Sequence, residues 1–225
     1  MDRNRPLIEQ IKAVIFDMDG IIFDSEQCVI NCWREVAERH GFPDIEEVCL
    51  KCIGTNDALT KKIVMDHYGE DFPYEAYREE MSALYHKRYD HGKLPQKTGV
   101  RELLAALKEE GLPCAVASST REAVVTMQLQ EAGLYPFFTT VIGGDKVEHS
   151  KPHPEIFIKA AEALNTAPQE CLVIEDSLMG IRAASAGGMI PVMVPDLVMP
   201  DVETEAKVYT VAEDLHQVRK LLFGS

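Results

Sequence analysis

The sequence contains no run of eighteen apolar residues, and the segment Met1–Pro6 lacks the apolar stretch of a secretory signal. A helix needs about 20 mostly apolar residues to cross a bilayer, so a membrane-spanning helix is excluded. A secretory signal needs an apolar segment behind its basic residues. We therefore expect a cytoplasmic protein that has no membrane partner.

Basic residues are scarce relative to acidic ones. The chain has 23 Lys and Arg against 37 Asp and Glu, which gives a formal net charge of −14. Nucleic-acid binders need a basic face that neutralises phosphates, so we expect no nucleic-acid partner. A small phosphate ester remains compatible, because one lysine and one metal ion suffice to hold it. The 46% hydrophobic and 27% charged fractions of 225 residues are those of a globular protein with one large domain or a core plus an insert.

Cysteine occurs six times, at positions 28, 32, 49, 52, 114 and 171. Cys114 and Cys171 stand in apolar runs and are expected to be small core residues. The other four permit a four-thiolate zinc site, but no glycine-rich knuckle flanks them. We favour reduced thiols packed in helices over zinc.

The segment 11–16 is short, apolar and β-branched, which predicts a buried strand. Asp17, Asp19 and Gly20 follow it directly. Ligands of open α/β sheets bind at the carboxyl ends of the strands. Two carboxylates there can divide the roles of nucleophile and general acid/base. The alternative is an acidic turn that merely ends the strand.

The next part of the chain, residues 25–93, shows helical periodicity and no strand pattern. We predict helices over 25–40, 44–52, 56–68 and 74–89, with Ser25 as the first N-cap. From 94 onward, strand and helix patterns alternate. The predicted strands are 113–117, 138–142, 171–174 and 190–194, and the predicted helices are 99–110, 121–132, 155–164 and 178–186. This alternation predicts a parallel sheet covered on both faces, formed by 1–24 and 94–225 and interrupted by an all-helical domain, 25–93.

Three further strand ends carry polar groups that would share an edge of this sheet. Ser118 and Ser119 precede a helix and form a candidate anion site, although Ser119 or Thr120 alternatively caps that helix. Lys151 precedes Pro152 in a segment that we expect to be stiff and extended, unless it is an ordinary solvated lysine. His149 and His153 are expected to be exposed loop residues.

Glu175 and Asp176 end the fourth predicted strand. Neighbouring strands would bring Asp17, Asp19, Glu175 and Asp176 together, and their charges would repel. A divalent cation with oxygen ligands, Mg²⁺, resolves this repulsion. The alternative role of Asp176 is to cap the helix that begins near Leu178.

The four motifs together resemble the haloacid dehalogenase superfamily, in the subgroup with a helical cap that includes β-phosphoglucomutase and phosphoglycolate phosphatases. They are Asp17-Met18-Asp19-Gly20, Ser118, Lys151-Pro152 and Glu175-Asp176 with Gly180. The resemblance covers essentially the whole length and implies a Rossmann-like core with an inserted cap.

The resemblance also implies roles. Asp17 would be the nucleophile that forms an aspartyl-phosphate, and Asp19 the general acid/base. Ser118, Ser119 and Lys151 would bind phosphate. The Mg²⁺ ligands would be Asp17, the Asp19 carbonyl, Asp176 and, through water, Glu175.

Within the family, Asp19 argues against a dehalogenase, which attacks carbon. Mutases of this cap type carry a histidine on the first cap helix and an arginine in the substrate loop. Here the helix has Glu26-Gln27-Cys28-Val29 and the loop has Thr55 and Asn56, and an amide is a poor substitute for arginine at a phosphate. We therefore favour a monomeric phosphatase of a small phosphorylated metabolite, with specificity residues Thr55 and Asn56. The alternatives are a sugar phosphomutase and a non-catalytic binding or regulatory protein.

Overall fold

The computed structural model describes residues 6–52 and 57–224, with the side chain of Asp57 left out. The chain divides into two compact units. The first comprises Met1–Phe23 and Gln96–Ser225, and the second comprises Asp24–Pro95. Each unit is described by itself.

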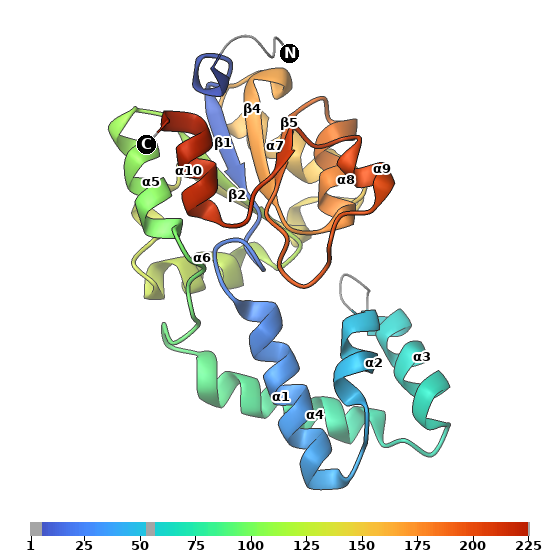
Figure 1. Ribbon diagram of the computed structural model, residues 1–225. Coiled ribbons are helices and arrows are strands. Elements are labelled where there is room, and N and C mark those ends of the chain that lie inside the picture. Colours follow the sequence, from blue (N-terminus) through green and yellow to red (C-terminus); the bar gives the residue numbers. More distant parts are fainter. Residues whose placement is uncertain (1–5, 53–56, 225) are drawn as a thin grey trace. The chain divides into compact units, whose positions relative to one another are not determined.

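The first unit is built on a six-stranded sheet in the order β3-β2-β1-β4-β5-β6 (Figure 1). All paired strands run parallel, which confirms the predicted parallel sheet. Register places Phe16 beside Val116 on one side and Ile174 on the other. The carboxyl ends of these central strands therefore lie at one edge. The strands are β1 Ala13–Phe16, β2 Cys114–Ser118, β3 Thr140–Gly143, β4 Cys171–Glu175, β5 Ile190–Met193 and β6 Thr210–Val211.

The helices of this unit bury apolar stripes against the sheet. Alternate residues of β1, β2 and β4, such as Ile15, Ala117 and Val173, form one cluster with Phe157 of α7 and Ala183 of α8. Period-2 alternation along a strand explains why every second residue joins this face. Elsewhere in this unit, helix α5 packs against helix α10 (Figure 1). The helices are α5 Val100–Glu109, α6 Glu122–Glu131, α7 Glu155–Ala163, α8 Leu178–Ala186, α9 Val202–Glu205 and α10 Leu215–Phe223.

The second unit consists of helices in its described part: α1 Ser25–His40, α2 Ile45–Cys52, α3 Asp57–Tyr68 and α4 Tyr74–Tyr89. Helix α1 contacts α2 and α4, and α2 contacts α3. The rings of Trp33 on α1 and Tyr77 on α4 meet edge to face, with centroids 5.6 Å apart. The Tyr77 hydroxyl donates a hydrogen bond to the Trp33 carbonyl oxygen, 2.5 Å away. This contact joins the two sixteen-residue helices of the unit.

Two sequence expectations are corrected at helix starts. Ser25 is the first residue of α1 and not its N-cap, which is Asp24. Helix α6 begins one residue later than predicted, with Arg121 as its N-cap, so neither Ser119 nor Thr120 caps it. No described helix combines the length and hydropathy that a bilayer crossing requires.

Candidate active site

Lys151 forms the centre of a buried charge cluster at the carboxyl edge of the sheet. Its ammonium nitrogen lies 2.5 Å from Oδ1 of Asp17, which follows β1, and 2.7 Å from Oε1 of Glu175, the last residue of β4. The side chain of Lys151 is only 8% exposed, so the solvated alternative is excluded. Burial alone would lower the pKa of Lys151, but the two carboxylates outweigh it and hold the pKa above its usual value.

The loop that carries Lys151 is a turn and not the extended segment that the prolines suggested. The N–H of His153 donates to the carbonyl oxygen of Ser150 at 3.0 Å, and the Lys151–Pro152 peptide bond is cis. Prolines restrict the residues before them, but they also occur in tight turns. The Lys151 nitrogen reaches back over the ring of Phe157, 4.8 Å from its centroid. The ring of Phe157, in the first turn of α7, thus packs against the Lys151 ammonium group.

Three buried carboxylates lie together at this edge. Oxygen atoms of Asp17, Glu175 and Asp176 lie within 4.8 Å of one another, and all three residues are buried. Burial raises the pKa of Asp17 to about 8; Lys151 opposes this rise, and Glu175 and Asp19 add to it. An ionised Asp17 therefore requires positive charge beyond Lys151. The donor set is all oxygen, which suits a hard divalent cation.

Helix α8 fixes the Glu175 carboxylate from the other side. The Oε2 atom of Glu175 accepts a hydrogen bond from the backbone N–H of Ser177 at 2.6 Å. The hydroxyl of Ser177 in turn accepts the N–H of Gly180 at 3.0 Å, so Ser177 caps α8. The alternative in which Asp176 caps this helix is therefore wrong, and its carboxylate lies instead with Asp17 and Glu175.

Asp19 is held by a residue that sequence reasoning did not assign to this role. The hydroxyl of Thr120 donates to Oδ2 of Asp19 at 3.2 Å. Ser118, fully buried at the end of β2, accepts the N–H of Thr120 at 3.1 Å, and Ser119 is exposed. The hydroxyl of Thr120 was visible in the sequence, but its contact depends on the path of the loop after β2.

A second loop braces the one after β2. The Oδ1 atom of Asp145 accepts the N–H of Glu122, the first residue of α6, at 2.7 Å. Gly143 and Gly144 pass so close to this loop that added Cβ atoms would lie 2.1 Å from the Glu122 nitrogen and 2.2 Å from the Ser119 carbonyl oxygen. Only glycine permits this approach. Ser118, Ser119 and Thr120 are thereby backed by the segment that follows β3.

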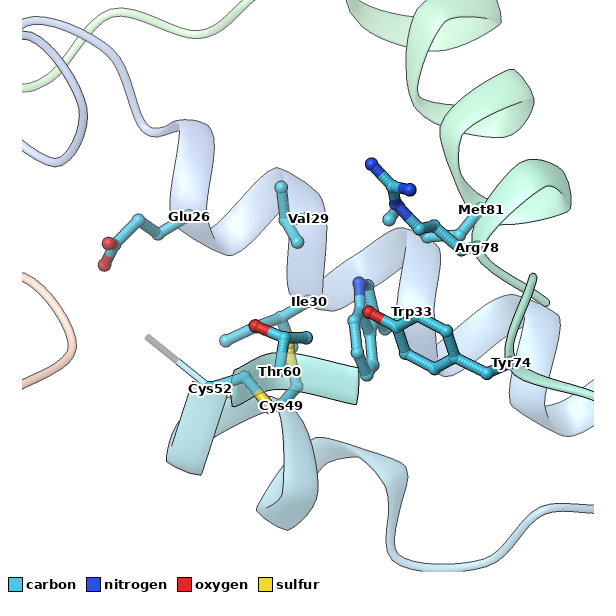
Figure 2. Close-up of a pocket in the computed structure, with 10 residues that line it drawn as sticks. All are labelled: Glu26, Val29, Ile30, Trp33, Cys49, Cys52, Thr60, Tyr74, Arg78 and Met81. Carbon is cyan, nitrogen blue, oxygen red and sulfur yellow. The ribbon is translucent and has the colours of Figure 1, made fainter. Parts of the chain in front are cut away.

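The helical unit contains a pocket of about 260 Å³ (Figure 2). Trp33 and Val29 of α1, Cys49 of α2 and Arg78 of α4 are among its lining residues. The indole nitrogen of Trp33 is buried and has no hydrogen-bond partner among the described residues. The pocket is thus mainly apolar, and the Trp33 indole N–H at its wall is available to a ligand. The predicted specificity residues Thr55 and Asn56 lie outside the described residues.

The cysteines of this unit lie in helices. Cys28, Cys32 and Cys49 are buried, and Cys52 is half-buried. Burial raises the pKa of Cys49 to about 12, so its thiol is protonated at neutral pH. In the described ranges, the groups of side chains close enough to share a metal ion consist of carboxylates and histidines.

A parallel α/β sheet with aspartates behind its first strand, a buried lysine and an acidic pair behind β4 defines a Rossmann-like α/β protein with a charged site at the carboxyl edge of its sheet. Comparison with known proteins gives the family. Residues 14–194 match the model of the haloacid dehalogenase-like hydrolases. The chain belongs to this family and is a hydrolase of the phosphatase type.

Proteins with different names are similar in sequence to this chain. The chain is 32% identical over 184 residues to a phosphorylated carbohydrates phosphatase of Thermotoga maritima, covering 80% of this chain and 82% of that protein. It is 31% identical over 192 residues to the β-phosphoglucomutase of Bacillus subtilis, covering 81% and 82%. The crystal structure of a β-phosphoglucomutase from Clostridium difficile superimposes with a TM-score of 0.69 at 26% identity, over 92% of this chain and 93% of that one.

Proposed function

We propose that this phosphatase hydrolyses a small phosphorylated metabolite, such as a sugar phosphate, through an aspartyl-phosphate on Asp17 and with Mg²⁺ as cofactor. The observation that carries the proposal is the buried contact of Lys151 with Asp17 and Glu175 at 2.5 and 2.7 Å. Phosphoryl transfer asks mainly for positioning and charge neutralisation, and this arrangement supplies both.

In the first half-reaction, an Oδ atom of Asp17 attacks phosphorus and the bond from phosphorus to the ester oxygen breaks. Asp19 gives its proton to the leaving oxygen, which departs as an alcohol. In the second half-reaction, Asp19 accepts a proton from water as that water attacks the phosphorus. The bond to Asp17 then breaks, and inorganic phosphate and free Asp17 remain.

Lys151 and the loop after β2 are proposed to hold the phosphoryl group. Lys151 offers a buried cation next to the Asp17 oxygen. Ser118 and Ser119 stand on the loop that leads to α6, where hydroxyl and backbone N–H donors suit phosphoryl oxygens. The hydrogen bond from the Thr120 hydroxyl holds the Asp19 carboxylate beside this loop.

The oxygen donors at this edge fit Mg²⁺. We propose that Asp17, Asp176 and the Asp19 carbonyl bind it directly, and that Glu175 acts through water because its own oxygens already serve Lys151 and Ser177. When bound, the ion supplies positive charge that keeps Asp17 ionised and offsets the charge of the phosphoryl group.

We further propose that the helical unit acts as a cap and selects the leaving group. Thr55 and Asn56 are the proposed specificity residues. The pocket lined by Trp33 and Arg78 supports this role because its size suits a small organic group. The similarity to the phosphorylated carbohydrates phosphatase of Thermotoga maritima supports a phosphorylated carbohydrate as substrate. We also propose that the enzyme is a cytoplasmic monomer.

A sugar phosphomutase is the second candidate, supported by the β-phosphoglucomutase of Bacillus subtilis. Glu26-Gln27-Cys28-Val29 and Asn56 lack the basic residues expected for holding a second phosphate, which favours hydrolysis. A binding or regulatory protein without catalysis is disfavoured because both Asp17 and Asp19 are present.

The test measures phosphate release from a panel of sugar phosphates and phosphoglycolate, with Mg²⁺ or with a chelator. We expect Mg²⁺-dependent release that Asp17→Asn abolishes and the exposed control Asp66→Asn retains. Full turnover in Asp17→Asn would overturn the mechanism. Isomerisation of β-glucose 1-phosphate in the presence of its bisphosphate activator, without phosphate release, would establish the mutase instead.

A further inference from the structure

His149, His153 and Glu155 form a cluster of ligand-type side chains outside the proposed active site. One ring nitrogen of each histidine and a carboxylate oxygen of Glu155 all lie within 4.8 Å of one another. The centroids of the two imidazole rings are 4.5 Å apart. The spacing His-x₃-His is one that zinc sites use.

Local backbone structure brings these three side chains together. The turn closed by the hydrogen bond from His153 to Ser150 folds the chain back, so that the two histidines face each other. Glu155 is the first residue of α7, and its carboxylate accepts the backbone N–H groups of Glu148 at 3.1 Å and His149 at 3.0 Å. The carboxylate is therefore positioned before any ligand arrives.

The charge and spacing of the cluster suit a divalent ion. The Lys159 ammonium and the Glu148 and His149 backbone N–H groups lower the pKa of Glu155 to about 2, so it is ionised at neutral pH. The Nδ1 atom of His149 lies 3.1 Å from Oε2 of Glu155. Two ligands that are each about 2.0–2.1 Å from a tetrahedral zinc ion lie about 3.3 Å apart, close to this separation.

We propose that His149, His153 and Glu155 bind a zinc-type transition-metal ion at the surface of the enzyme. Two imidazoles and one carboxylate favour Zn²⁺ over Mg²⁺ or Ca²⁺, which prefer oxygen ligands. Three protein ligands leave the fourth tetrahedral position to water. A proton on Nδ1 of His149 moves to Nε2 of the same ring, so the metal replaces the shared hydrogen bond without proton release.

Lys159 competes with the ion for Glu155. Its ammonium nitrogen lies 2.8 Å from Oε1 of the carboxylate. Removal of this cation therefore strengthens metal binding. Lys151 lies midway between the two histidines in the sequence. An ion bound by both histidines therefore restrains the turn that carries the phosphate-binding lysine.

Isothermal titration of chelator-treated protein with ZnCl₂, in excess Mg²⁺ to occupy the carboxylate edge, tests the proposal. We expect one Zn²⁺ per chain at this site. His149→Ala and His153→Ala should each weaken its binding at least about tenfold, in line with loss of one ligand. Lys159→Met should tighten it, and the exposed control His216→Ala should leave it unchanged.

Both histidines are exposed, so their variants should fold, which circular dichroism checks. Zn²⁺ should raise the melting temperature of the wild type and not that of the double histidine variant. Undiminished Zn²⁺ binding in that folded double variant would overturn the proposal, because the ion would then be bound elsewhere, for example by thiols. Absence of Zn²⁺ binding to the wild type would overturn it equally. Neither result bears on phosphate release by Asp17.

Discussion

The Cα atom of Gly180 in α8 lies so close to Glu175 that a Cβ atom built on it would be 1.7 Å from Oε1 of the carboxylate. That same oxygen accepts the hydrogen bond of Lys151. The absence of a side chain at position 180 therefore determines where the Glu175 carboxylate, and through it the Lys151 ammonium, can lie.

Gly180→Ala should consequently damage catalysis without any contact to substrate. The added methyl group must displace the Glu175 carboxylate, and a displacement of about 1 Å in such a site can cost roughly 100-fold in rate. Steady-state kinetics of phosphate release measure this. Gly187→Ala at the other end of α8, where the nearest contact is 3.3 Å, is the matched control and should retain activity. Equal rates for both variants would refute this role of Gly180.

Lys151→Met should remove both activity and stability. The variant leaves the buried carboxylates of Asp17 and Glu175 without their cation, and breaking a buried ion pair in this way costs about 3–5 kcal/mol. Urea unfolding near neutral pH gives the free energy of unfolding. Lys62→Met, which removes an exposed ion pair with Asp66, should change it by less than about 1 kcal/mol. A stable Lys151→Met protein would show that the cluster carries little net stabilisation.

Asp145→Asn should change the acid stability of the protein. The N–H of Glu122 holds the pKa of Asp145 below its ordinary value of 3.8 in the folded state. A lowered folded-state pKa stabilises the fold above pH 3.8 and loses this effect as the pH falls through the folded-state value. Unfolding midpoints should therefore differ between wild type and variant at neutral pH, and the difference should shrink as the pH falls below 3.8. A constant difference would contradict the prediction.

Removal of Mg²⁺ by a chelator should abolish phosphate release, and its return should restore it. Mg²⁺ should also raise the melting temperature, because an ion that binds only the folded state stabilises it. Asp176→Asn should shift both effects to higher Mg²⁺ concentration, since one charged ligand is lost. Thermal unfolding at a series of Mg²⁺ concentrations measures this independently of turnover. A melting temperature that does not change with Mg²⁺ concentration would exclude binding of the ion at this edge.

The sequence predicted most of the fold because its elements have strong patterns. Helices α4 and α8 have their predicted bounds, and β1 begins two residues later than predicted. The C-terminal elements were not predicted. Strand β6 has two residues and α9 four, which is too short for periodicity to reveal. Strand β6 exists only through its pairing with β5, a contact that only the folded chain provides.

The candidate site was predictable to the extent that topology alone determines it. Parallel strands bring Asp17 and Glu175 to one edge whatever their loops do. The contacts of Thr120 with Asp19 and of Asp145 with Glu122 depend instead on the paths of two loops. Lys151 illustrates both cases, because its position was expected but the turn that carries it was not.

Trp33 is the only tryptophan of the chain, and it lines the pocket of the helical unit. All intrinsic tryptophan emission therefore originates in that unit. Far-ultraviolet circular dichroism, by contrast, reports helices of both units. Denaturation followed with the two signals should thus reveal whether the halves melt together or in sequence, with no label attached to the protein.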